Sequence, residues 1–390
     1  MRLLPFDYAV RNLGRSRARM LLTMVGSGLV VVLVITAAAF VRGMDLALRA
    51  TGEQDNVIVI GAGSEESLER SEVNASVASL LSASITGIRS RAGIDYVSPE
   101  VQVLLPLRIR PDQPNAPMVL VRGITPAACL VHASVQIVAG RLPVAGADEV
   151  MIGATVSVKM AVSNADLGLD KSIIIDKRPF KIVGHFVAPG TVTEAEVWTP
   201  LTDLKQVTKR TTDSCVIVTL DRRKAEFADI ATFTKMRPDL ELAATTEMAY
   251  FAKLSSFFAP IRLVAWVTAC LIAIGGLFGG LNTMYAAFVS RVRELGTLQS
   301  IGFRRLAIVV SLVQESTLAT AVGALAASAV GLFLLDGIAI RFSRGTFGLT
   351  VDASVLGVAL VAGVALGLFG ALPPAWHCLR LAIPEALKSI

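Results

Sequence analysis

The sequence is poor in charge and in the residues that usually build catalytic or metal sites. Only 17% of its 390 residues are charged, and 53% are hydrophobic, which is too apolar for an ordinary soluble protein. Its four cysteines show no CxxC spacing, and its three histidines are scattered. It has no GxxxxGK(S/T), HExxH or GxSxG motif and no Ser/His/Asp or Cys/His set at motif spacing. We therefore expect a membrane protein with no catalytic residue, no bound cofactor and no bound metal.

The net charge of +6 has a simple explanation in a membrane protein. Lysine and arginine lie mostly in segments next to apolar runs, and they do not gather on one basic face with aromatic residues. Short loops that stay in the cytoplasm carry such an excess of basic residues. We expect contact with membrane lipid and no nucleic-acid partner.

Long apolar segments predict four membrane-spanning helices, at 20–43, 261–290, 306–335 and 353–372. The basic segment 1–19 before the first of them suits an amphipathic helix on the inner membrane face. A cleaved signal peptide is the alternative, because Ala37–Ala39 resembles a cleavage site. The apolar run is longer than a signal core, which favours a helix that stays in the membrane.

Residues 44–260 have ordinary polarity and no spanning run, so they predict a folded domain outside the membrane. Two strand-then-helix patterns lie near its ends, with helices expected at Ser76–Arg91 and Arg223–Met236 and a strand-rich region between them. Helical segments at Met44–Arg49 and Glu247–Phe258 lead into membrane helices, and Pro260 is expected to kink the second. The overall fold class is a four-helix membrane protein with a large α+β extracytoplasmic domain. A disulfide between Cys129 and Cys215 is left open.

The segment 291–305, RVRELGTLQSIGFRR, is a short polar loop between two apolar helices. Its four arginines and single acid predict a cytoplasmic position, which places both termini inside, the link 336–352 outside and the tail 373–390 inside. Val292, Leu295, Leu298 and Ile301 repeat at near-helical spacing and form an apolar stripe. The alternative is that the arginines only anchor helix ends at lipid headgroups.

Two features within the predicted spans need an explanation. Glu315, beside Gln314, lies at a depth where a carboxylate must face protein, water or a partner side chain. A structural hydrogen bond between helices and a role in proton or substrate passage are both open. Small residues that permit close helix packing, within one chain or between two, are Gly275, Gly276, Gly279, Gly280, Gly363 and Gly367.

The loop, with its Arg-x-Arg-Glu-Leu-Gly step, its Leu-Gln-Ser-Ile-Gly-Phe-Arg-Arg run and the early Glu of the next helix, resembles the signature of FtsX/MacB-type permeases of ABC transporters. Similar landmarks lie in Asp7–Gly26, Gly140–Pro143, Asp148–Gly153 and Phe180–Gly184, and in the tail. Leu169-Asp170-Lys171 replaces a usual Gly-Asp, and Cys378 stands where alanine is common. The resemblance covers nearly the whole chain.

This resemblance implies a porter-like part at 44–122 and 211–256 around a strand-rich insertion at 123–210. It also implies that the loop is a coupling helix on a separate ATP-binding subunit, which would hold ATP and Mg. The residues expected at that contact are Arg291, Arg293, Glu294, Leu295, Gly296, Ile301, Gly302 and Arg304.

By the same resemblance the chain is a permease of the bacterial inner membrane that works with a second permease chain, either a copy or a paralogue. Mechanotransmission would serve efflux or the release of lipoprotein or lipid, with a membrane-fusion protein or a lipoprotein carrier as a further partner. The alternative is an FtsX-like scaffold that activates a periplasmic cell-wall hydrolase. A membrane-anchored enzyme is a third option, but the sequence offers no catalytic set for it.

Overall fold

The computed structural model describes residues 8, 10–12, 17–113, 116–342 and 345–380. The chain forms two compact units. The membrane unit contains residues up to Gly43, Pro260–Ile338 and the chain from Leu349 onward, and the outer unit contains Met44–Ala259 and Ala339–Gly348. Most of the predicted amphipathic helix at 1–19, and the tail from 381, lie outside the described residues.

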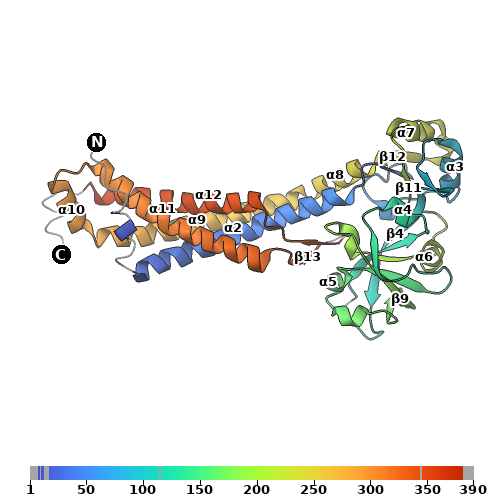
Figure 1. Ribbon diagram of the computed structural model, residues 1–390, viewed down its shortest axis with the longest axis horizontal. Helices are drawn as coiled ribbons and strands as arrows, with labels where there is room; N and C mark the ends of the chain where they lie inside the picture. The colour runs from blue at the N-terminus through green and yellow to red at the C-terminus, as the bar shows by residue number, and fades with distance from the viewer. Residues whose placement is uncertain (1–7, 9, 13–16, 114–115, 343–344, 381–390) are drawn as a thin grey trace. The chain divides into compact units, whose positions relative to one another are not determined.

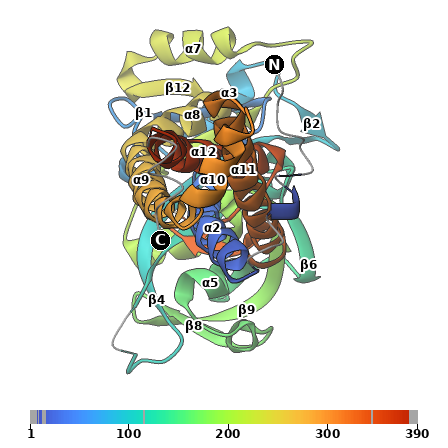
Figure 2. The same ribbon diagram turned by 90° about the vertical axis from the view of Figure 1, so that its left-hand side faces the viewer.

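Four long helices make up the membrane unit: α2 (Arg17–Thr51, which continues into the outer unit), α9 (Ala259–Val289), α11 (Arg305–Val330) and α12 (Ala353–Cys378). Each is long and apolar enough to cross a membrane, and together they contain the four predicted spans. A π-helical turn, η5 (Gly331–Leu335), extends α11. Figures 1 and 2 show the four helices side by side, with the short helix α10 (Val292–Ser300) at one end of the bundle.

Some of the predicted glycines are sites of close helix contact within the chain. A Cβ on Gly363 would lie 2.5 Å from the Cβ of Ala324, and one on Gly367 would lie 2.3 Å from the hydroxyl of Thr320, so both let α12 approach α11. Gly276 of α9 packs in the same way on Val30 of α2. Gly275, Gly279 and Gly280 do not: an added Cβ there would meet nothing within 4 Å.

Helix α12 continues to Cys378, six residues beyond the predicted span at 353–372. Proline inside a helix removes a backbone hydrogen bond and normally bends or ends it, yet Pro373 and Pro374 lie within α12. Here Ala371, Ala375 and Cys378 belong to a buried cluster with residues of α9, α10 and α11. This packing keeps the segment helical beyond the two prolines.

The outer unit contains a ten-stranded sheet in the order β12-β1-β11-β4-β5-β10-β7-β9-β6, with β8 pairing β4 and β9 off this path. Its strands are β1 (Asn56–Gly61), β4 (Val97–Arg108), β5 (Met118–Ile124), β6 (Gln136–Gly140), β7 (Glu149–Gly153), β8 (Ser172–Ile175), β9 (Arg178–Val187), β10 (Val197–Pro200), β11 (Cys215–Thr219) and β12 (Leu242–Thr246). Two further strands of two residues each, β2 (Ser90–Arg91) and β3 (Ile94–Asp95), pair with each other in a separate sheet.

The twelve-residue strand β4 joins two hydrophobic cores. Its first four residues, Val97–Glu100, pair with β11, and the remaining residues pair with β5 and β8. The first core contains residues of β1, β11, α3 (Val77–Ser84) and α7 (Phe227–Met236). The second core contains Val101, Leu107, Val119 and Val121 together with residues up to Leu204. The strand-rich core therefore already includes residues from 101 onward, earlier than the predicted boundary at 122/123.

One predicted helix of the outer unit is shorter than its prediction, and another agrees with it. The helix expected at Ser76–Arg91 is only α3, because the chain leaves the helix at Ile85 and Ile88 forms a bridge with Leu220. Helix α8 (Glu247–Phe257) follows the prediction closely. It ends just before α9 begins at Ala259, so Pro260 falls in the first turn of the next helix, where its missing N–H costs nothing.

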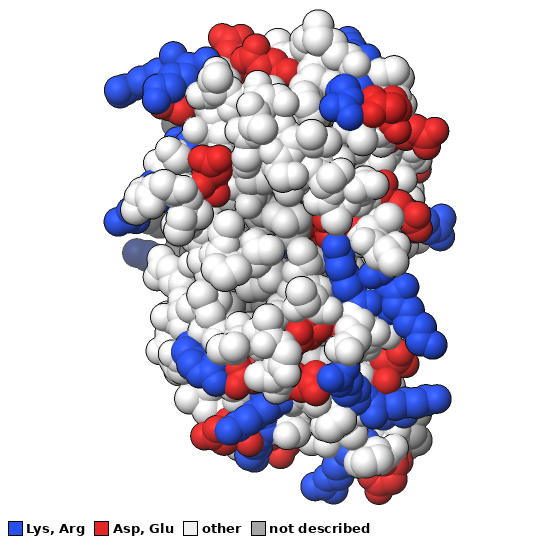
Figure 3. All heavy atoms as spheres, turned by 90° about the vertical axis from the view of Figure 1, so that its right-hand side faces the viewer, with Lys and Arg blue, Asp and Glu red and all other residues white. Residues whose placement is uncertain are grey.

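The link 336–352, predicted as a plain loop, contributes a β-hairpin to the outer unit. Strands β13 (Ala339–Arg341) and β14 (Thr346–Gly348) pair in antiparallel register, and Phe347 is buried. Two short connections in the outer unit, α5 (Val156–Met160) and η3 (Val192–Ala195), contact this hairpin. Figure 3 shows one face of the molecule, where charges of both signs surround a largely uncharged centre.

Candidate functional site

Helix α10 forms the compact joint between α9 and α11. The chain turns after Val289, where the amide of Arg291 donates to the carbonyl of Phe288 (3.0 Å). At the other end Gly302 has φ +100°, a left-handed conformation that favours glycine, and its amide donates to the carbonyl of Gln299 (3.0 Å). Gly302, predicted as a partner contact, therefore already has a local role: it ends α10 and lets the chain reverse into α11.

The apolar stripe of α10 packs against its own bundle. Val292 and Leu295 are 5% and 2% exposed in a cluster with residues of α9, α11 and α12, and Leu298 packs against the same cluster. Ile301, the last member of the stripe, is 70% exposed. Three of the four residues therefore fix α10 to the membrane unit, and only Ile301 presents an apolar surface outward.

A cluster of buried polar side chains connects the start of α10 to α11. The Nη1 of Arg291 donates to both carboxylate oxygens of Glu315 (3.2 and 3.1 Å), and its Nε donates to Glu294 (3.3 Å). The Nδ2 of Asn12 donates to the same Glu315 carboxylate (2.7 Å). Arg291, Glu315 and Asn12 are all less than 10% exposed. Glu315 thus connects three segments: the N-terminal region, the start of α10 and the middle of α11.

Electrostatics keep Arg291 charged in this setting. Burial alone would lower the pKa of its guanidinium, but the Glu315 and Glu294 carboxylates raise it. Its Nη2 is buried and finds no hydrogen-bond acceptor among the described residues. Gln314 is half-buried beside Glu315. The structure therefore favours the interhelical role for Glu315 that the sequence left open.

The predicted contact residues divide into two groups. Arg291, Leu295 and Gly296 are buried against the bundle, so the prediction that they face a partner does not fit the geometry. Arg293, Ile301, Gly302 and Arg304 are exposed, and Glu294 is partly exposed. Helical periodicity predicted the apolar stripe of α10 but not which surface it contacts. An apolar stripe on a short helix beside a bundle can face either that bundle or a partner subunit.

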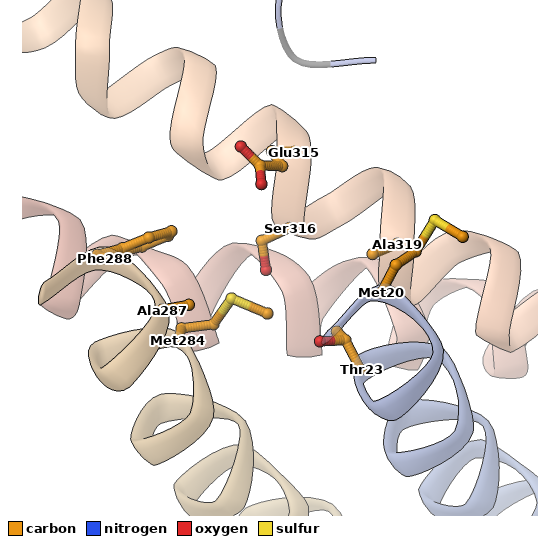
Figure 4. A pocket seen from close by; sticks show the side chains of 8 residues that line it. All are labelled: Met20, Thr23, Met284, Ala287, Phe288, Glu315, Ser316 and Ala319. Atoms are coloured by element: carbon orange, nitrogen blue, oxygen red, sulfur yellow. The ribbon is translucent and has the colours of Figure 1, made fainter. Parts of the chain in front are cut away.

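A small cavity of about 20 Å³ lies beside Glu315 (Figure 4). Side chains of α2, α9 and α11 line it, and Ser316 points into the space between these helices. The hydroxyl of Ser316 has no hydrogen-bond partner among the described residues. A cavity of this size has room for about one water molecule.

The outer unit has a buried charge cluster of its own, which the sequence did not reveal. Arg122 donates through Nη1 to Glu100 (2.5 Å) and through Nε and Nη2 to Glu196 (2.6 and 2.7 Å). His132 also meets the Glu100 carboxylate (2.7 Å), and Trp198 donates to Glu196 (2.8 Å). Glu100 lies where β4 changes partners, so the cluster sits at the seam between the two cores.

The ionisation of this cluster follows from its pairing. Burial would raise the pKa of Glu100, but His132 and Arg122 outweigh it and lower the pKa to about 2. Burial would lower the pKa of His132, and the Glu100 carboxylate raises it instead.

Cys129 and Cys215 are both free thiols in the structure, and burial raises the pKa of each.

Family comparison accounts for both units. Residues 20–230 match the model of the MacB-like periplasmic core domain, and residues 266–383 match the FtsX-like permease C-terminal model. The chain belongs to the FtsX/MacB-type permeases of ABC transporters. The permease is accordingly a membrane protein with a periplasmic domain between its first two membrane helices.

Two solved structures are similar to part of the permease. The periplasmic region of MacB from Actinobacillus actinomycetemcomitans aligns with 15% identity and a TM-score of 0.40, over 53% of this chain and 95% of that one. The extracellular domain of the noncanonic ABC-type transporter YknZ from Gram-positive bacteria aligns with 14% identity and a TM-score of 0.36, over 49% of this chain and 99% of that one. No curated protein matches the chain.

Proposed function

We propose that this permease couples ATP hydrolysis on a separate ATP-binding subunit to conformational change in its periplasmic domain, in the service of efflux or of lipoprotein or lipid release. ATP and Mg belong to that subunit. The observation that carries the proposal is the construction of α10: it is packed on the bundle through Val292 and Leu295 and tied to α11 through Arg291 and Glu315. A force applied to α10 is therefore applied to α11.

The exposed side of the joint is the surface proposed for the ATP-binding subunit. It presents Arg293, Ile301 and Arg304, two cations around one apolar side chain. Aromatic, apolar and arginine anchors are typical of the residues that dominate protein interfaces. Both termini are proposed to share the cytoplasmic side with α10.

Co-purification tests this surface. In Arg293→Glu and Ile301→Asp variants, we expect loss of the ATP-binding subunit from the purified complex and loss of permease-stimulated ATPase activity. Arg223→Glu is the matched control, since Arg223 is exposed in the outer unit and the charge change is the same. Wild-type co-purification and ATPase rates in both loop variants would refute the proposed docking surface.

A second permease chain is proposed to cover α9. Only 6% of the most apolar stretch of α9 is buried in this chain, against 33 to 39% in the other three spans. Gly275 and Gly279 are one helical turn apart and have open space at the Cβ position, as a closely packed second helix requires. A copy of this chain is the proposed occupant, and a paralogue is the alternative.

Neighbouring glycines of α9 provide a matched test of this assembly. Gly275→Leu should weaken dimerisation by at least tenfold in detergent while the monomer keeps its thermal stability, because an added Cβ at Gly275 meets no described atom within 4 Å. Gly276→Leu should lower the stability of the monomer, because it collides with Val30. Unchanged dimerisation in Gly275→Leu, measured by sedimentation, would move the contact away from this face.

The FtsX-like regulatory scaffold remains the runner-up. The C-terminal match fits it, but the match to the MacB-like periplasmic core domain favours transport or release. Efflux would require a membrane-fusion protein as a further partner, and lipoprotein release would require a lipoprotein carrier.

A further inference from the structure

The hairpin β13–β14 is fixed to the outer unit by specific contacts. The Nζ of Lys159 in α5 donates to the carbonyl of Phe342, and the hydroxyl of Thr346 donates to that of Thr155 (2.6 Å). Thr346 and Phe347 are 3% and 4% exposed. A surface loop that only joined two membrane helices would have no need of buried polar contacts of this kind.

Aromatic packing adds to these contacts. The rings of Phe342 and Phe347 meet edge to face at 5.6 Å, and Phe342 meets Phe258 in the same way at 5.6 Å. Phe258 is the residue directly after α8, and it is 5% exposed. Edge-to-face pairs contribute beyond the area that they bury.

The same region receives the end of the first long helix. Thr51, the last residue of α2, accepts a hydrogen bond from the amide of Val192 in η3 (3.0 Å). On the other side of η3, a Cβ added to Gly345 would lie 3.2 Å from the carbonyl oxygen of Val192, so the hairpin backbone lies against this residue. Within the outer unit, η3 therefore contacts both the end of α2 and the hairpin.

We call strands β13 and β14, together with Phe342 and Gly345, the clasp. From these contacts we propose that the clasp transmits movement of α11 and α12 to the strand-rich core through α5 and η3. The clasp is joined covalently to η5 and α12 by two short arms, residues 336–338 and 349–352. Since α10 is bound to α11 and η5 extends α11, a displacement at the cytoplasmic joint has a continuous path to α5. This inference rests on the proposed function, because it needs an ATP-dependent displacement at α10.

Two hydrogen bonds connect the two arms to each other. The amide of Gly337 donates to the carbonyl of Leu349 (2.9 Å), and the amide of Val351 donates to the Asp336 carboxylate (2.8 Å). The clasp transmits displacement only while its arms remain short. A hairpin that merely covered the outer unit would work equally well on longer arms.

Lengthening the arms separates the two roles. Four Gly/Ser residues would be inserted between Gly337 and Ile338, and four between Leu349 and Thr350, in the full chain with its ATP-binding partner. The control is an insertion of the same total length at Gly93, an open turn between β2 and β3 where an added Cβ meets nothing. Hydrogen exchange would be measured by mass spectrometry with and without a non-hydrolysable ATP analogue.

In the parent we expect the analogue to change exchange in α10, α5 and η3. In the long-arm variant we expect an unchanged response at α10, loss of the response at α5, and a partial response at η3, which α2 still contacts through Thr51. A full response at α5 in the long-arm variant would overturn the clasp proposal. A parent that responds at α10 but not at α5 would also overturn it and leave the proposed function standing, whereas no response at α10 would remove both.

A point variant covers the case in which the insertions prevent folding. Lys159→Met with Thr346→Val removes the two polar contacts at nearly constant volume, and Lys235→Met with Thr211→Val, both on the exposed surface, is the matched control. The clasp proposal predicts at least a threefold smaller exchange response at α5 in the first variant and a parental response in the control. An equal response in both would overturn it.

Discussion

The two buried charge clusters of this permease differ in how completely they are satisfied. In the outer unit Arg122 uses all three of its nitrogens, with contacts of 2.5 to 2.7 Å. In the membrane unit Arg291 reaches Glu315 through one nitrogen at 3.1 and 3.2 Å, and its Nη2 has no acceptor among the described residues. A fully satisfied network fixes one arrangement, whereas a partly satisfied one loses less when it rearranges.

This difference suits the positions of the clusters. The outer cluster joins two cores that must move as one body if displacement is to reach the whole domain. The inner cluster lies beside α10, the joint that is proposed to move when the ATP-binding subunit closes. The outer cluster is therefore expected to serve rigidity, and the inner one to serve a change between two arrangements.

The largest expected effect comes from breaking the outer cluster. Arg122→Met leaves the carboxylates of Glu100 and Glu196 buried without their main cation, which costs roughly 3–5 kcal/mol. This is a large part of the 5–15 kcal/mol that typically holds a domain together. Thermal unfolding of the full chain in detergent should show a strongly lowered Tm for the outer unit. Arg223→Met is the control, because Arg223 is exposed in the outer unit and its loss should change the Tm only slightly; equal Tm values for both variants would contradict the comparison.

The inner cluster should show a smaller loss and a clear rescue. Glu315→Leu leaves Arg291 buried beside Glu294 alone, at a cost of about 3 kcal/mol, near the lower limit for a broken buried pair. The double variant Glu315→Leu with Arg291→Leu should recover most of the stability, because an apolar pair of similar volume replaces the ion pair. Both variants should still lose ATPase stimulation, since the tie between α10 and α11 is absent. A double variant as unstable as the single one would show that the pair is not the source of the effect.

The sequence was enough to predict what depends on composition and local pattern. Four spans, the helical segments that flank the outer domain, and the polar loop at 291–305 all follow from runs of apolar residues and their interruptions. Family landmarks then gave the fold of the outer unit. The carboxylate at Glu315 was also recognisable as a residue that needs a partner, because burial of an unpaired charge is so unfavourable.

Partners far apart along the chain were not predictable. Asn12 lies 303 residues from Glu315, and Arg291 looked like one of four equivalent loop cations until the structure placed it inside. The charge cluster of Glu100, Arg122 and Glu196 comes from three segments with no motif. The hairpin was missed because its strands have three residues each, too short for a periodic pattern.

The smallest predicted effect concerns pH and sharpens the comparison further. The pKa of His132 is higher in the folded protein than its unfolded value of 6.5. Pairing of His132 with Glu100 therefore stabilises the outer unit fully at pH values below 6.5. This contribution is lost as the pH rises through the folded pKa of His132. The folded pKa of Glu100 is lowered from 4.5 to about 2, so its contribution is present above 4.5 and is lost as the pH falls toward 2. Stability from this pair is therefore greatest between about 4.5 and 6.5.

His132→Gln tests this window because it removes the titrating ring and keeps a hydrogen-bonding side chain. The Tm difference between parent and variant should be largest from pH 5 to 6 and should shrink as the pH rises beyond the folded pKa of His132. His185→Gln is the control, since that ring contacts only the carbonyl of Leu167 and has no carboxylate partner among the described contacts. A difference that stays constant from pH 5 to 9 would mean that His132 acts through packing against Trp198, whose ring centroid lies 5.5 Å away, and not through its charge.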